Sequence, residues 1–207
     1  MIAHPHSYWL GSAPHALADA WVVDAAAFDA ALPGIDVART VVCLRAIDRP
    51  GSNGLERDLA RPRAAGIAVL MLLGVRDISD VCAITECCPQ TVVPVIDNLR
   101  GLDQLRAIAN LPGVARLVFD AAAIQRELGV EHEDGLLAHR AQMVLASRLA
   151  GLPPPIDDST LPPQRARQLG FGATLCRDAA DLQSARLAFG PLRSSAAPSF
   201  PTLHEPS

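Results

Sequence analysis

The sequence contains no lysine, and its 18 basic residues other than histidine are all arginine. Aldolases that work through a Schiff base need a lysine amine to condense with the carbonyl group of the substrate. That class of enzyme is therefore excluded. A reaction at a carbon–carbon bond would instead need a metal ion to stabilise the enolate.

Aromatic residues and long apolar runs are also scarce. Only 4% of the 207 residues are aromatic, so the core of this half-hydrophobic chain must consist mainly of Ala, Val, Leu and Ile. No apolar run approaches the roughly 18 residues that a membrane span requires. The first residues, MIAHPHSYWL, lack the charged start and the apolar stretch of a signal peptide. We therefore expect a cytoplasmic protein that does not bind a membrane.

The sequence has neither a basic surplus nor a cysteine framework. Its 18 basic residues stand against 22 acidic ones, and the formal net charge of −4 argues against a nucleic-acid partner. The five cysteines form no CxxC pair, and their odd number argues against a disulfide framework. The Gly51-Ser52-Asn53-Gly54 stretch is neither a dinucleotide fingerprint nor a Walker loop, which weighs against an open doubly wound sheet.

Short apolar runs alternate with helical patterns along the chain, which is typical of repeated βα units. Eight strands are expected, at Ser7–Leu10, Trp21–Val23, Thr40–Arg45, Ile67–Leu73, Thr91–Ile96, Ala115–Phe119, from Ile156 onward, and at Ala173–Cys176. Eight strand–helix pairs are what a closed parallel barrel needs. We predict a small α/β protein with a single-domain (β/α)8 TIM barrel over residues 1–190 and a mobile Ser/Pro/Ala-rich tail over residues 191–207.

The helices between these strands follow from apolar spacing and from Gly and Pro positions. They are expected from Ala13-Pro14 onward, at Phe28–Leu32, Gly54–Ala65, Ile78 to about Cys87, Leu102–Asn110, Gly135–Ala150, Pro162–Leu169 and Ala180–Phe189. In the longest of them, Leu137, Ala141 and Leu145 recur at i, i+4 and i+8, which predicts that this stripe is the apolar face. Asp178 is the expected N-cap of the last helix.

Three segments in the second part of the chain carry a family resemblance. These are PVIDNLRGLDQLRAIANLPGVARLVF (Pro94–Phe119), AHRAQMVLASRLAGLPPPIDD (Ala138–Asp158) and RARQLGFGATLC (Arg165–Cys176). In this order they resemble the HpcH/HpaI aldolase and citrate lyase beta-subunit family, which includes malyl-CoA lyases.

The resemblance implies a TIM barrel that binds a divalent metal, usually Mg²⁺, and cleaves or forms a carbon–carbon bond next to a thioester or carboxylate. The substrate would be a small carboxylate or a coenzyme A thioester. By the same resemblance, Arg45 matches the arginine that holds the substrate carboxylate, and Asp97 takes the place of a metal-binding Glu. Asp120 is the nearest carboxylate to the second metal position, so Asp97 and Asp120 are the candidate metal ligands.

The sequence departs from the family at several of these positions. The residue at position 97 is Asp where the family has Glu, which retracts the carboxylate by about 1.5 Å, one carbon–carbon bond. Ala122 or Ala123 stands where the second acidic ligand is expected, and Arg177-Asp178-Ala179 replaces an Ile-His-Pro stretch. No residue is assigned as a catalytic acid or base, because no histidine falls at a strand end. We therefore expect weak metal binding and little or no lyase activity.

Two functions from different classes remain open, beside a third alternative, a barrel with changed chemistry. The first is a metal-dependent carbon–carbon lyase or aldolase, and the second is a catalytically degenerate barrel, a pseudoenzyme that serves as a binding or assembly partner. Asp97 and Asp120 could also merely cap the helices that follow them, and Arg45 could pair with Asp48 or Asp97. Family members generally form homo-oligomers, so we also predict a homo-oligomer with the segment after Leu182 at an interface.

Overall fold

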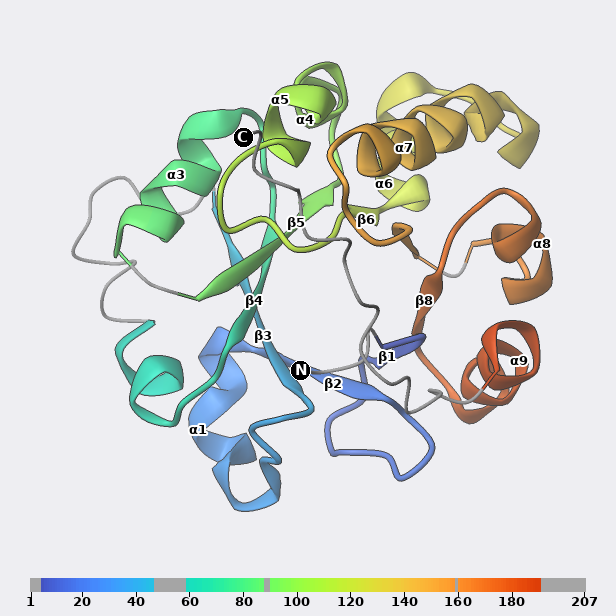
Figure 1. The fold of residues 1–207 in the computed structure, drawn as a ribbon. Coiled ribbons are helices and arrows are strands. Elements are labelled where there is room, and N and C mark those ends of the chain that lie inside the picture. The colour runs from blue at the N-terminus through green and yellow to red at the C-terminus, as the bar shows by residue number, and fades with distance from the viewer. Residues whose placement is uncertain (1–4, 47–58, 88–89, 159, 191–207) are drawn as a thin grey trace, which may run out of the picture.

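The fold is a closed barrel of eight parallel strands, ordered β1 to β8 as in the sequence (Figure 1). The structure is a computed structural model that describes residues 5–46, 59–87, 90–158 and 160–190. The strands are β1 (Ser7–Trp9), β2 (Ala20–Asp24), β3 (Thr40–Arg45), β4 (Val69–Leu73), β5 (Thr91–Ile96), β6 (Val118–Phe119), β7 (Ile156–Asp157) and β8 (Ala173–Cys176). The prediction of a small TIM barrel is confirmed.

Parallel pairing of neighbouring strands brings all their carboxyl ends to one rim of the barrel. The ring closes where Tyr8 of β1 pairs with Leu175 of β8. Inward-facing side chains alternate with outward-facing ones, as the pleat requires. The interior cluster is built from small and branched residues with one aromatic: Tyr8, Ala20, Val22, Val41, Cys43, Met71, Val93, Val95, Val118, Ile156, Ala173 and Leu175.

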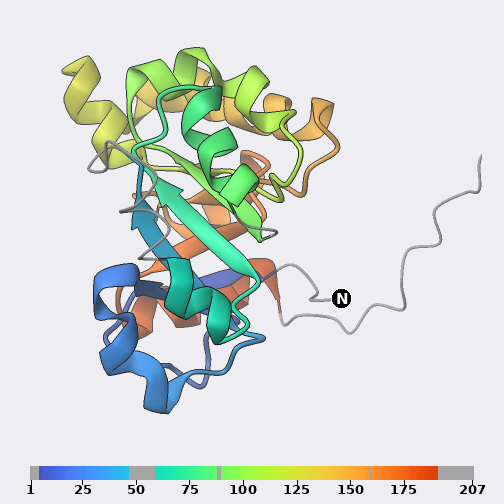
Figure 2. The same ribbon diagram turned by 90° about the vertical axis from the view of Figure 1, so that its left-hand side faces the viewer.

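The helices lie outside the barrel and surround the strands, as Figure 2 shows from the side. They are η1 (Ala25–Ala27), α1 (Phe28–Ala31), η2 (Leu32–Gly34), α3 (Ile78–Cys87), α4 (Leu99–Asp103), α5 (Leu105–Ala109), α6 (Ala121–Leu128), η3 (Glu133–Leu136), α7 (Leu137–Leu149), α8 (Pro163–Gln168) and α9 (Ala179–Phe189). Residues 59–64 are also helical. Of the predicted helix Gly54–Ala65, residues 54–58 lie outside the described residues, as does the predicted tail.

The helix expected to open at Ala13-Pro14 does not form. Residues 11–19 contain no helix, and they connect β1 to β2 as a loop. Two tryptophans from the flanking strands hold this loop. The indole of Trp9 donates a hydrogen bond to the carbonyl of Ala13 at 2.8 Å, and that of Trp21 donates to the carbonyl of Gly11 at 2.8 Å. Side-chain donors thus satisfy carbonyl groups that a helix would have paired internally.

The helical region before β6 is also more finely divided than predicted. Instead of one helix over Leu102–Asn110, α4 and α5 are two short helices that meet at Gln104. The helix α6 was not predicted from the sequence; it begins one residue after β6 and ends at Leu128, with Gly129 as its C-cap. Gly129 adopts a left-handed conformation with φ of 69°, which suits glycine at a helix C-terminus.

The face of α7 that meets the core differs from the predicted stripe. Leu145 is 47% exposed, whereas Arg140, Met143 and Ser147 are buried. The reason is the buried ion pair between Arg140 and Asp157 of β7, which turns the helix so that an arginine faces the barrel. The spacing of the leucines could not reveal this orientation, because an arginine on an amphipathic helix is ordinarily exposed.

No helix in the described ranges is both long and apolar enough to cross a membrane.

Candidate functional site

Charged residues gather where the strands end at the carboxyl rim of the barrel. Arg45 is the last residue of β3, Asp97 follows β5 and Asp120 follows β6. The closed parallel topology therefore places all three sequence-predicted site residues at the same rim, where TIM barrels carry their active sites. Asp158, after β7, and Arg177, after β8, join them.

Asp97 links the end of β5 to the loop after β4. Its Oδ2 accepts a hydrogen bond from the backbone N–H of Gly74 at 2.9 Å, and its Oδ1 accepts one from Nδ2 of Asn98 at 2.8 Å. Asn98, not Asp97, is the N-cap of α4, because its Oδ1 accepts from the N–H of Gly101 at 2.9 Å. The capping alternative is thus wrong for Asp97.

Asp120 is the N-cap of α6, so the capping alternative is confirmed for this residue. Its Oδ1 accepts a hydrogen bond from the N–H of Ala123 at 2.9 Å. Burial raises the pKa of the Asp120 carboxyl, and the negative charges of Asp158 and Asp97 raise it further, against the opposing effects of the Ala123 hydrogen bond and of Arg177. The three carboxylates therefore share one region of negative potential at the rim.

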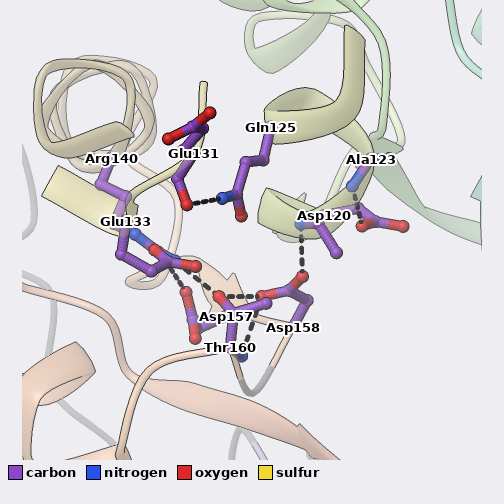
Figure 3. A network of polar contacts seen from close by, with 10 residues as sticks. Asp120, Ala123, Gln125, Glu131, Glu133, Arg140, Asp157, Asp158 and Thr160 are labelled. Atoms are coloured by element: carbon purple, nitrogen blue, oxygen red, sulfur yellow. Dashed lines mark hydrogen bonds and ion pairs between the residues drawn. The ribbon is translucent and has the colours of Figure 1, made fainter. Parts of the chain in front are cut away.

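Asp158 is a rim residue that the sequence analysis did not single out. It is buried, and its Oδ2 accepts a hydrogen bond from the N–H of Ala122 at 3.0 Å, while its Oδ1 accepts from the hydroxyl of Thr160 at 2.9 Å (Figure 3). Arg177 donates to the carbonyl oxygen of Asp158 at 2.7 Å. The signal in the sequence was the doubled acid in PPPIDD, which was considered only as part of a family motif.

Asp157, the other acid of that pair, belongs to a buried network behind the rim. It forms an ion pair with the fully buried Arg140, which also pairs with Glu133 at 2.8 Å and donates to the hydroxyl of Thr160 at 2.7 Å (Figure 3). Burial raises the pKa of Asp157 to about 7, in spite of the attraction of Arg140. Because Thr160 contacts both Arg140 and Asp158, the network holds the rim carboxylate in place.

Arg45 and Cys43 lie two residues apart on β3, so both side chains point to the same side of the strand. Arg45 is exposed, and the side chain of Cys43 is part of the barrel interior. Burial, together with the nearby charge of Asp24, raises the pKa of the Cys43 thiol to about 12. This cysteine is therefore a protonated core residue and not a nucleophile. Asp48, the other proposed partner of Arg45, lies outside the described residues.

Oxygen donors of this kind suit a hard cation such as Mg²⁺, which commonly takes one or two carboxylates and completes its shell with water. Within residues 5–46, 59–87, 90–158 and 160–190, no group of three His, Cys, Asp or Glu side chains is arranged to hold a metal ion. A site here would rest on Asp97 and Asp120. Their oxygens fit Mg²⁺ in donor type and charge, although the hydrogen bonds they already accept predict weak binding.

Comparison with solved structures identifies proteins of the same fold. RipC from Yersinia pestis is 19% identical with a TM-score of 0.73, and the match covers 94% of this chain and 99% of RipC. A citrate lyase beta subunit from Mycobacterium tuberculosis, solved with oxaloacetate and magnesium, is 20% identical with a TM-score of 0.71, covering 91% of this chain and 98% of its own.

The protein CitE from Mycobacterium tuberculosis, in complex with magnesium, acetoacetate and coenzyme A, is 20% identical with a TM-score of 0.74, and the match covers 92% of this chain and 82% of CitE. No family model matches the sequence, and no curated protein is significantly similar to it. Identities near 20% establish the fold alone. The chain therefore has the fold of citrate lyase beta subunits, which is consistent with the resemblance carried by its sequence motifs.

Proposed function

We propose that the carboxyl rim binds a small carboxylate or an acyl-CoA thioester together with a divalent cation, in a slow reaction of the carbon–carbon lyase or aldolase class. One observation carries this proposal: a guanidinium group at the end of β3 and two carboxylates after the neighbouring strands β5 and β6 lie at one rim of a barrel that has no lysine. The solved structures of this fold that contain magnesium with oxaloacetate, or with acetoacetate and coenzyme A, support it.

Each candidate residue would have a distinct role. Arg45 would bind the substrate carboxylate through paired N–H groups, the geometry that guanidinium offers. Asp97 and Asp120 would hold Mg²⁺, and Asp158 would add negative potential beside them. When bound, the ion would supply the positive charge that stabilises an enolate, which no lysine in this chain can replace.

A second candidate, binding without turnover, is favoured by a specific observation. Both oxygens of Asp97 and one oxygen of Asp120 accept hydrogen bonds from the protein itself. In addition, the residues that follow Asp120 are alanines, so the first turn of α6 contributes no further carboxylate. A weakly held ion on Asp97 and Asp120 would still supply positive charge that favours binding of a carboxylate ligand at the rim, but it would accelerate the reaction little.

The first experiment measures metal binding by titrating the protein with Mn²⁺ and following the electron paramagnetic resonance signal of the free ion. We expect weak binding that Asp97→Ala abolishes and that Asp103→Ala leaves unchanged, since Asp103 is an exposed residue on α4. Equal binding by both variants and the unaltered protein would contradict the assignment of Asp97.

The second experiment measures acetyl-CoA release from malyl-CoA and from citryl-type thioesters at millimolar Mg²⁺. We expect little or no release, because the shortened carboxylate at position 97 and the missing second acid weaken the metal site. Robust turnover that Asp97→Ala abolishes would establish a fully active lyase and reject the degenerate alternative. Absence of turnover, together with Mn²⁺-dependent binding of oxaloacetate, would leave binding as the function.

A further inference from the structure

A cavity opens at the end of the barrel where the strands begin, opposite the carboxyl rim. Its volume is about 160 Å³. The lining comes from the first residues of several strands and from the segment before β6, chiefly Tyr8, Val41, Val69, Val93 and Arg116. The strand starts are the end of the barrel farthest from Arg45, Asp97 and Asp120, so this cavity is separate from the carboxyl rim.

The scarcity of aromatic residues explains why this space is not filled by the protein. Tyr8 is the one aromatic member of the interior cluster, and the positions around it are occupied by Ala20, Val41 and Val93. Larger side chains at these positions would close the lower end of a barrel of this size. The result is a hollow with largely apolar walls, in which the Tyr8 hydroxyl and the Arg116 guanidinium are buried polar groups; the lining also includes Asp19, Thr40 and the exposed Arg39.

Arg116 is a buried cation with neutral partners. Arg116 is 3% exposed, and its Nε donates a hydrogen bond to the carbonyl of Pro154 at 2.7 Å. Its Nη1 donates to the carbonyl of Pro5 at 2.7 Å and lies 3.5 Å from the Tyr8 hydroxyl. No carboxylate in the described part of the chain forms an ion pair with it.

An uncompensated buried charge is costly, because the protein interior replaces water poorly around an ion. The charge of Asp19 acts on Tyr8, but Oδ2 of Asp19 already accepts hydrogen bonds from the N–H groups of His6 and Ser7 and from the Ser7 hydroxyl. Burial also raises the pKa of Tyr8, which keeps its hydroxyl protonated and able to donate. Arg116 and Tyr8 together therefore offer hydrogen-bond donors to an anion.

We propose that this cavity binds a small organic monocarboxylate with a compact apolar body, its carboxylate on Arg116 and Tyr8 and its body against Val41, Val69 and Val93. The size is suitable, since an apolar cavity of about 150 Å³ can hold one benzene molecule. A monoanion matches the single buried guanidinium, whereas the Asp19 carboxylate in the lining disfavours a second negative charge. This site is independent of the function proposed for the rim.

The test uses benzoate as the probe and benzamide as its neutral counterpart, with affinity measured by isothermal titration calorimetry on the full chain. We expect benzoate to bind at least about tenfold more tightly than benzamide, because a hydrogen bond between two charged groups is stronger than one to a neutral amide. Arg116→Met should remove that preference, and Arg148→Met, at an exposed position of α7, should retain it. Absence of benzoate binding at millimolar concentration would overturn the proposal.

Two further variants keep the test decisive. Val69→Phe fills the cavity without changing its charge and should abolish benzoate binding even if Arg116→Met fails to fold. Arg45→Met removes the guanidinium at the opposite rim and should leave benzoate binding unchanged. If Arg45→Met abolishes binding while Val69→Phe does not, benzoate occupies the carboxyl rim, and the proposal of a second site is wrong.

Discussion

At the scale of single residues, the pair of adjacent acids Asp157 and Asp158 divides into two roles. Ile156 faces the barrel interior, so Asp157 points outward to Arg140 between the strands and α7. The guanidinium of Arg140 lies over the rings of Phe119 and Phe171, with distances of 5.3 and 5.8 Å to their centroids. Asp158 then turns toward the rim. Two adjacent residues thus differ in role: the Asp157 carboxylate is structural, and the Asp158 carboxylate is a candidate functional group.

The raised pKa of Asp157 predicts how stability depends on pH. An aspartate in the unfolded chain has a pKa of about 3.9, whereas Asp157 in the folded protein has a pKa of about 7. Between these values the folded state binds one proton more than the unfolded state. The contribution of this group to the free energy of unfolding is therefore complete below pH 4 and falls by about 1 kcal/mol per pH unit as the pH rises to 7.

Urea unfolding of the protein and of Asp157→Asn at pH 5, 6, 7 and 8 measures this contribution. We expect the stability of the unaltered protein, relative to the variant, to decrease from pH 5 to 7 and then level off. Asp103→Asn, at an exposed position, should show no such trend. A relative stability that instead increases with pH would mean that the attraction of Arg140 outweighs the effect of burial.

At the scale of secondary-structure elements, the contact between α4 and the loop after β4 fixes the surroundings of Asp97. Asn98 donates to the carbonyl of Val75 at 2.9 Å, and Gly101 lies directly beneath the same carbonyl. A Cβ atom on Gly101 would lie 2.3 Å from the Val75 oxygen, so only glycine allows α4 to approach so closely. The same loop supplies the Gly74 N–H that binds Asp97.

Gly101→Ala should therefore destabilise the protein by about 1–3 kcal/mol, the range for a forced overpacking in which backbone must move. It should also weaken Mn²⁺ binding at the rim, because the displaced loop carries the donor that orients Asp97. The matched control is Gly135→Ala, whose new methyl group would contact side-chain atoms of Val130 at 3.2 Å instead of a backbone oxygen. Stability is measured by thermal unfolding. An equal loss of stability in both variants would mean that the contact with the Val75 oxygen is unimportant.

The strands that the sequence predicts best are those with long runs of β-branched residues. The bounds of β3 and β5 match the predicted ranges, because these runs are filled with β-branched residues that suit a buried parallel strand. By contrast, β6 is only two residues long, since the preceding Arg116 is used at the lower end of the barrel. The orientation of α7 depends on the ion pair of Arg140 with Asp157.

The candidate site, like the fold, could be predicted only in part from the sequence. Arg45, Asp97 and Asp120 were placed at strand ends by the repeated βα pattern and by the family resemblance, and the structure brings them to one rim. Asp158 was missed because no local pattern distinguishes it from its neighbour Asp157. Arg116 was missed for a similar reason: a charged residue before a strand is ordinarily solvated, and only the closed barrel shows that it is buried.

At the scale of the whole molecule, the surface bears on the predicted assembly. Leu187 on α9 is 80% exposed, and it falls within the segment after Leu182 that the sequence analysis placed at an interface. On the other face of the same helix, Leu182 and Ala185 are buried against the barrel. A large apolar side chain left in water on an ordered helix suits a contact with a second copy of the chain, which in a symmetric dimer would repeat on both subunits.

We predict a homo-oligomer that depends on Leu187, measurable by size-exclusion chromatography with light scattering at micromolar concentration. Leu187→Arg should shift the population toward the monomer, because the symmetric contact would bring two buried arginines together, while a cation near a helix C-terminus leaves α9 itself stable. The matched control is Ile78→Glu, which places a charge at the 44% exposed first residue of α3, on a different side of the barrel (Figure 1). Its mass should equal that of the unaltered protein.

A monomeric unaltered protein would refute the predicted assembly. An oligomer that persists in Leu187→Arg but not in Ile78→Glu would place the interface at α3 instead of α9.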